Sequence, residues 1–137
     1  MKKLALFCVS LLLALTLGTV EAAPPVPGGT LTLLTASPAL GQVASFEYTL
    51  SGGVRECPNG GTNKCARIQV VCSQNGNVVY GEAYPAVHPF NILLGGGGSV
   101  WLSNGGPADC TATLYYWDFT PVQTFVPLAS VSFTAAG

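Results

Sequence analysis

The sequence predicts an all-β protein, a two-sheet antiparallel sandwich of seven or eight strands that is disulfide-stapled. Two observations predict it. From residue 30 onward, short runs of β-branched and aromatic residues alternate with glycine, asparagine and proline turns, and no apolar run keeps a helical period. The same part of the chain carries four cysteines, Cys57, Cys65, Cys72 and Cys110, an even number typical of a small exported domain.

The first 22 residues have the pattern of a secretory signal peptide. Two lysines precede an apolar run over 4–17, and small residues occupy the positions before a cut after Ala22. The run is short for a membrane span, so an uncleaved anchor is the less favoured alternative. We therefore expect export to the periplasm, the cell surface or the medium, without membrane insertion after cleavage. Residues 23–29, rich in proline and glycine, form an extended leader, and 30–137 form one domain.

The β-rich runs between turn clusters predict the strands in order. They cover 30–35, 42–50, 66–73, 78–84, 90–94, 99–102, 108–118 and 125–134. The four glycines of 95–98 read as a flexible connection between two of these strands, with neither the lysine nor the helix of a phosphate-binding loop. Trp101, in the short run 99–102, is expected to point outward.

Asn75-Gly76 is the strongest local signal, because a two-residue hairpin turn needs positive φ at both central positions. A regular hairpin around it places Cys72 opposite Val79 on the core side. It also places Arg67 opposite Tyr84 on the solvent side.

The cysteine pairing follows from the strands that carry them. Cys72 ends one strand, Cys110 begins another, and both face inward, so antiparallel neighbours would bring them together. Cys57 and Cys65 then close the glycine-rich loop between them. The other two pairings would join inward with outward positions. The spacings of eight, seven and thirty-eight residues lack the paired C-x₂-C pattern of a zinc site, so no metal is expected.

Two segments resemble those of bacterial immunoglobulin-like domains. The segment 37–48 resembles their turn between the first and second strands, and 107–116 resembles their sixth strand. Immunoglobulin domains join the second and sixth strands by a disulfide, whereas here the third would join the sixth. The resemblance implies a role in adhesion, display or spacing, by analogy of architecture alone.

The charged and titratable residues give little support to catalysis. The single histidine, His88, precedes a proline in a predicted loop, with nothing in the spacing that indicates a triad or a copper site. Five acids after residue 22 are scattered, and only three bases, Arg55, Lys64 and Arg67, accompany them. Such a surface cannot track nucleic-acid phosphates or hold anionic lipid. We expect a protein that is not an enzyme and that needs no cofactor.

The outward face of the middle strands is the candidate binding site. If Cys72 pairs with Cys110, Arg67 lies opposite Tyr115, so Tyr84, Arg67 and Tyr115 form a row with Trp117 one step along. Aromatic residues and arginine are favoured anchors of protein interfaces, although they also make good strands. The leading hypothesis is contact with a protein partner or with copies of the same chain. The alternatives are a carbohydrate-binding module that uses the same rings and an enzyme inhibitor that uses the Cys57–Cys65 loop.

Overall fold

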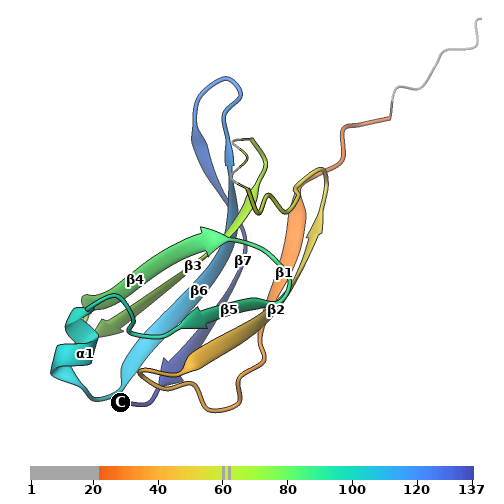
Figure 1. Cartoon of the computed structure of the whole chain (residues 1–137). Coiled ribbons are helices and arrows are strands. Elements are labelled where there is room, and N and C mark those ends of the chain that lie inside the picture. Colours follow the sequence, from red (N-terminus) through yellow and green to blue (C-terminus); the bar gives the residue numbers. More distant parts are fainter. Residues whose placement is uncertain (1–21, 60, 62) are drawn as a thin grey trace, which may run out of the picture.

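Two antiparallel sheets make up the computed structural model, which describes residues 22–59, 61 and 63–137 (Figure 1). The expected signal peptide lies outside the described residues except for Ala22. One sheet has the order β1 (Gly28–Leu33), β2 (Val43–Ser51), β5 (Phe90–Leu93). The other has the order β4 (Asn77–Pro85), β3 (Ala66–Gln74), β6 (Ala108–Asp118), β7 (Thr124–Ala135). One short helix, α1 (Val100–Asn104), joins β5 to β6.

The core lies between the two sheets, where alternate side chains of each strand face inward. In β3 the inward positions are Ala66, Ile68, Val70 and Cys72, all fully buried. The second layer contributes the buried rings of Phe46, Tyr48 and Phe90 and the side chain of Ile92. This period of two is what makes each strand of a sandwich half core and half surface.

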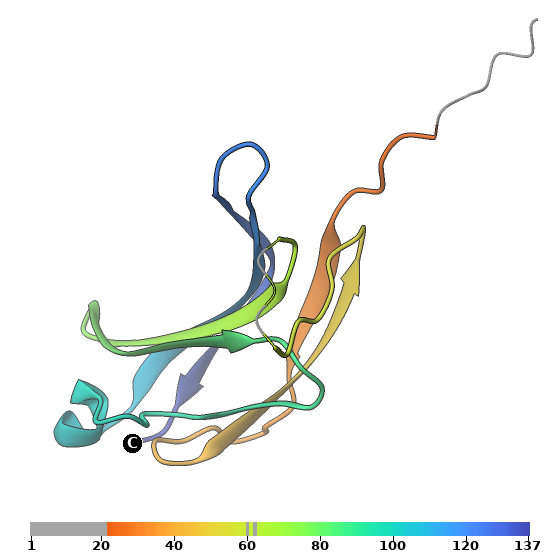
Figure 2. The same ribbon diagram turned by 45° about the horizontal axis from the view of Figure 1, so that its top comes forward.

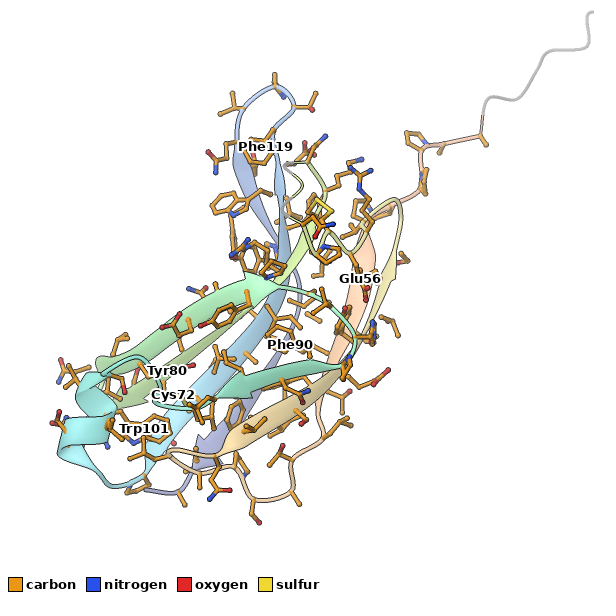
Figure 3. All side chains as sticks on the ribbon, in the orientation of Figure 1. Glu56, Cys72, Tyr80, Phe90, Trp101 and Phe119 are labelled. Atoms are coloured by element: carbon orange, nitrogen blue, oxygen red, sulfur yellow. A yellow bond between two sulfur atoms is a disulfide. The ribbon has the colours of Figure 1, made fainter. Side chains whose placement is uncertain are left out.

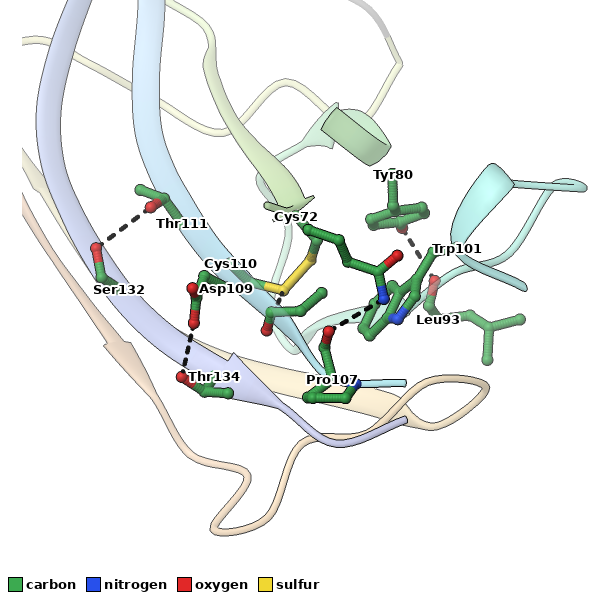
Figure 4. Close-up of a disulfide and its surroundings, with 12 residues drawn as sticks. Cys72, Tyr80, Leu93, Trp101, Pro107, Asp109, Cys110, Thr111, Ser132 and Thr134 are labelled. Atoms are coloured by element: carbon green, nitrogen blue, oxygen red, sulfur yellow. Dashed lines mark hydrogen bonds between the residues drawn. A yellow bond between two sulfur atoms is a disulfide. The ribbon is translucent and has the colours of Figure 1, made fainter. Parts of the chain in front are cut away.

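Both disulfides form in the pairing that the facing strands indicate. Cys72 and Cys110 lie directly opposite each other on β3 and β6, with their Cα atoms 4.0 Å apart (Figure 4). Cys57 and Cys65 close the loop before β3, with Cα atoms 5.4 Å apart. Two disulfides place the chain in an oxidising, non-cytosolic compartment. In the part of the chain that the structure describes, no helix is long and apolar enough to span a bilayer.

The predicted register of the β3–β4 hairpin is wrong beyond its first two residue pairs. The turn itself is as expected, with φ of 50° at Asn75 and 80° at Gly76. Past Ser73 the register shifts by one residue, so that Cys72 pairs with Tyr80 and not with Val79. The extra residue in β4 is a β-bulge, and a slip of one residue moves every later side chain of β4 to the opposite face. Tyr84 consequently lies opposite Ile68, an inward position, and not opposite Arg67.

The expected strand over 99–102 is a helix. Gly95, Gly97 and Gly98 adopt positive φ and turn the chain, and the Ser99 hydroxyl then accepts from the Leu102 N–H as an N-cap. Trp101 is completely buried, contrary to the outward orientation expected. Its indole N–H donates to the Gly106 carbonyl at 2.8 Å and so satisfies its polar atom. The helix closes the end of the sandwich farthest from the β6–β7 turn (Figures 1 and 2).

Candidate functional site

Three of the four predicted site residues come together on the outer face of the four-stranded sheet. Arg67 pairs with Tyr115 across β3 and β6, as predicted, and Trp117 follows two residues later on the same face. Tyr84 is excluded from this group by the bulge in β4. It lies 47% exposed at the sheet margin, beside a hollow of about 320 Å³ that it lines with Tyr80 and residues of β5.

An aromatic cluster replaces the predicted row. Phe125 of β7 lies opposite Trp117, and its ring is 4.6 Å from that of Tyr115 and 5.5 Å from that of Trp117. Tyr115 is only 5% exposed because these two neighbours cover it, so it supports the cluster more than it contacts solvent. The sequence analysis missed Phe125. The register of the β6–β7 hairpin would have revealed it, but the loop length did not fix that register.

Apolar side chains continue from the cluster to the tip of the β6–β7 hairpin. Phe119 is 40% exposed, Phe125 41% and Val122 70%. The hairpin projects beyond the rest of the sandwich, with Phe119 near its end (Figure 3). We call Tyr115, Trp117, Phe119 and Phe125 the aromatic surface. Exposed apolar side chains gathered at one projecting turn mark an interaction site more often than scattered ones do.

The Cys57–Cys65 disulfide borders the aromatic surface. The Lys64 N–H donates to the Trp117 carbonyl at 3.1 Å, and the Phe119 N–H donates to the Asn63 side-chain oxygen at 3.3 Å. A hollow of about 220 Å³ opens between the two segments. Its lining includes Cys57, Cys65, Arg67, Pro85, Trp117 and Phe119. The disulfide loop and the aromatic surface, which sequence reasoning treated as separate sites, therefore form one continuous end of the molecule.

All the lysines and arginines of 22–137 belong to this end. Arg55 forms a β-bridge with Cys65, and Lys64 and Arg67 lie within two residues of Cys65 in the sequence. The Arg67 guanidinium donates to the Ala83 carbonyl at 3.1 Å, so it leans toward β4 and away from the Tyr115 side of the strand. The three cationic residues thus lie in segments that border the aromatic surface, and Arg67 does not stack in a row with its rings.

His88 belongs to a second polar cluster, between the end of β4 and the start of β5. Its ring stacks on Tyr48 with centroids 4.0 Å apart. Nδ1 contacts the Glu56 carboxylate, which also accepts from the Tyr48 hydroxyl, and Nε2 lies 3.2 Å from the Tyr48 carbonyl oxygen. The Glu47 carboxylate is 3.9 Å from Nε2. Both ring nitrogens therefore face oxygen acceptors, an arrangement that suits the doubly protonated imidazolium.

The pKa values in this cluster follow from those contacts. The hydrogen bond to Glu56 raises the pKa of His88, although desolvation acts in the opposite direction. The hydrogen bond from Tyr48 is the main cause that lowers the pKa of Glu56, with His88 adding to it. Among the described residues, no serine, threonine or cysteine side chain is hydrogen-bonded to His88. His88 and Glu56 form an ion pair that joins the β4–β5 connection to the segment between β2 and β3, and the Tyr48 hydroxyl of β2 is held by the same carboxylate.

A further hollow, of about 430 Å³, lies at the α1 end. The Gln74 amide there donates to the Gly105 carbonyl at 2.7 Å and to the Pro107 carbonyl at 3.0 Å. These bonds hold the α1 corner against the β3–β4 turn, so the Gln74 amide that lines this hollow already has structural partners. Within the described ranges, no three His, Cys, Asp or Glu side chains gather as metal ligands would.

No protein-family model, curated protein or solved structure matches this chain. A sandwich of two sheets supports many unrelated functions, so the fold by itself selects none of them. The functional conclusion depends on the aromatic surface, its charges and its disulfide.

Proposed function

We propose that the chain is a secreted, non-catalytic, immunoglobulin-like module that binds a protein partner through the aromatic surface. The single observation that carries the proposal is the β6–β7 tip, where Phe119, Val122 and Phe125 stay exposed on a projecting hairpin. Burying such side chains against a partner removes apolar area from water, and aromatic residues are favoured anchors of protein interfaces.

The strand order supports the immunoglobulin-like part of the proposal. Constant-type immunoglobulin domains place the first, second, fourth and fifth strands in one sheet and the third, sixth and seventh in the other. The fourth strand departs from this pattern, because β4 pairs with β3 here. The strands β1, β2 and β5 share one sheet here, and β3, β6 and β7 share the other. The disulfide between β3 and β6, within one sheet, remains a departure from that family.

The ring orientations favour a protein over a carbohydrate. The Trp117 ring meets the Tyr115 ring at 87° and the Phe125 ring at 71°. Tyr115 and Phe125 are closer in tilt, at 35°, but Tyr115 is only 5% exposed and offers no free face to a sugar. A sugar stacks face to face on an aromatic ring, so a platform for several sugar units needs rings of similar tilt. Rings packed edge to face make a bumpy apolar surface, which suits interdigitation with side chains.

The surrounding charges indicate what the partner carries. Arg55, Lys64 and Arg67 lie beside the aromatic surface, whereas Glu56 is already paired with His88. A partner that presents carboxylates around an apolar centre would match this arrangement and would bind less tightly as salt increases. An enzyme inhibited through the Cys57–Cys65 loop is one such partner, because that loop borders the same surface.

The test replaces Phe119 and Phe125 together with alanine. The matched control replaces Val100 and Leu102, which are 59% and 56% exposed on α1 at the far end of the domain. The oxidised wild-type chain and both variants are immobilised and exposed to the secreted and cell-surface proteins of the producing organism. We expect the wild type and the α1 variant to retain the same protein, and the tip variant to lose it.

The proposal fails if the tip variant retains that protein as well as the wild type does. A glycan array provides the second arm. Saturable binding of a free oligosaccharide that the tip variant loses would replace the protein partner with a carbohydrate. Substitution of Asn59 and Asn63 that abolishes retention more completely than the tip variant does would assign the contact to the disulfide loop.

A further inference from the structure

The outer edge of β7 differs from the other sheet edges of this molecule. β7 has twelve residues, none of them charged. By comparison, β5 has four residues, β1 has six, and β4 carries Glu82 and ends at Pro85. Natural proteins protect exposed strand edges with charges, prolines, bulges or covering segments, because an open edge pairs readily with another strand.

The β7 edge is protected at both ends, and between them β1 packs close to β7 without pairing with it, so the middle of the edge lacks backbone partners within the described segments. At the C-terminal end, the Ala136 N–H donates to the Pro38 carbonyl at 2.9 Å, and the Ala136 carbonyl accepts from the Leu40 N–H at 2.8 Å. At the other end, the register shifts between Leu114 and Tyr115, and Pro127 follows on β7. A bulge twists the strand, and a proline offers no N–H, so pairing stops there.

The direction of the free backbone groups follows from Ala136. Both of its backbone groups bond to the segment 38–40, so both point away from β6. In an antiparallel ladder, alternate residues direct both backbone groups to the same side. Ser130, Ser132 and Thr134 therefore also direct N–H and C=O away from β6. In the described part of the chain, β7 pairs with β6 alone, and these three residues have no backbone partner on the other side.

We infer that this open stretch, residues 129–135, pairs with the same stretch of a second copy of the chain. A two-fold axis at Ser132 places Ser132 opposite its own copy and Ser130 opposite Thr134 of the second copy. Each of these facing residues offers one N–H and one C=O, so every pair exchanges two hydrogen bonds. The two four-stranded sheets then join into one continuous sheet.

The side chains favour a second copy over another strand. The pairing places Val131 opposite Phe133 on the inner face and hydroxyl residues opposite hydroxyl residues on the outer face. The outer hydroxyls already form such contacts with β6, between Thr111 and Ser132 at 3.2 Å and from Thr134 to Asp109 at 3.0 Å (Figure 4). No charge on β7 meets its own copy, so no like-charge repulsion opposes the pairing. The protected ends confine the pairing to this stretch, so each chain pairs with one other chain and forms a closed dimer, not a fibre.

Sedimentation equilibrium of the oxidised exported chain, up to about 1 mM because a small interface is weak, tests the pairing. The test variant is Ser132→Pro, which removes an N–H from the free edge and no bond to β6. Ser132→Lys is the second variant, since it places two like charges on the axis. The control is Thr113→Lys, which adds the same charge to the outer face of β6 and leaves the edge intact.

We expect the wild type and Thr113→Lys to approach twice the single-chain mass as concentration rises, and both Ser132 variants to stay at the single-chain mass. Near-ultraviolet circular dichroism checks that each variant is folded, and Ser132→Lys decides the outcome if Ser132→Pro is not. A wild type that stays monomeric overturns the inference. So does a dimer that survives in the folded Ser132 variants, or one that Thr113→Lys disrupts equally, since that result indicates stacking of sheet faces. The inference does not depend on the aromatic surface, and Phe119→Ala with Phe125→Ala should leave the dimer intact.

Discussion

Replacing both cysteines of one disulfide with alanine tests how the two bonds divide the stability of the domain. The bond Cys72–Cys110 joins two central strands and encloses a sequence separation of 38 residues. The bond Cys57–Cys65 closes a surface loop with a separation of 8. In the chain-entropy model, a disulfide stabilises by restricting the unfolded chain, and the effect grows with the logarithm of loop length.

The expected magnitudes follow from the two separations. The model gives about 4 kcal/mol for the 38-residue separation and about 2.5 kcal/mol for the 8-residue separation at 25 °C. Cys72 and Cys110 are also 0% and 2% exposed, so their replacement leaves space in the core and adds to the loss. Cys57 is half-buried and Cys65 is 7% exposed, so this pair leaves a smaller defect. We therefore expect the Cys72→Ala, Cys110→Ala variant to lose at least about 1.5 kcal/mol more than the other double variant.

Urea unfolding, followed by tryptophan fluorescence and by far-ultraviolet circular dichroism, measures both losses. Coincident transitions from the two probes justify a two-state free energy, and similar m-values show that the unfolded states are comparable. Equal losses, or a greater loss for the Cys57→Ala, Cys65→Ala variant, would refute the reasoning. Such a result would mean that the inter-strand bond contributes little beyond the packing of β3 against β6.

The remaining predictions concern single side chains. Tyr115→Ala should lower the free energy of unfolding in urea by about 3 kcal/mol, because the ring is only 5% exposed. Phe125→Ala should lower it by about 1 kcal/mol, because that ring is 41% exposed. Equal losses would contradict the packing described. Trp101→Phe should lower stability by about 1 kcal/mol, because it removes the donor to the Gly106 carbonyl, and a neutral result would contradict that bond. The pKa of His88 is raised above its ordinary 6.5, so its contribution to stability is complete below that pH and declines as pH rises through the folded pKa. The pKa of Glu56 is lowered, so its contribution to folding stability is complete above pH 4.5 and is lost as the pH falls through the folded pKa. His88→Gln should accordingly destabilise the protein most between these two pH values and less at about pH 8.5; a pH-independent effect would exclude the ion pair.

Local features that the residue types themselves determine, such as a turn or the inward face of a strand, were predictable from the sequence. Asn75-Gly76 defines its turn because both residues tolerate positive φ, and the alternation of residues 109–117 defines which side of β6 faces the core. With the further assumption that the strands of Cys72 and Cys110 are antiparallel neighbours joined by a disulfide, Cys72 was placed beside Cys110 and Arg67 beside Tyr115, and both placements are confirmed. The start of β1 was placed only two residues late, at 30 and not at Gly28.

Features that depend on one extra residue were not predictable. Val78, Val79 and Tyr80 are all good strand residues, so nothing in their chemistry marks the bulge that turns Tyr84 to the inner face. The same limit applied to β7, where the loop 119–123 left the position of Phe125 open. The helix at Val100 was missed although Ser99 is a suitable N-cap, because five residues are too few for a helical period to show.

Site-specific photocrosslinking at the β6–β7 tip tests the proposed contact most directly. A photoreactive phenylalanine analogue replaces Phe119 in one sample and Leu102 in another, two positions with similar exposure at opposite ends of the domain. Illumination of the exported chain in the producing cells should yield one discrete protein adduct from position 119 and none from position 102. Adducts of equal yield from both positions, or none from position 119, would contradict the assignment of the aromatic surface as the contact site.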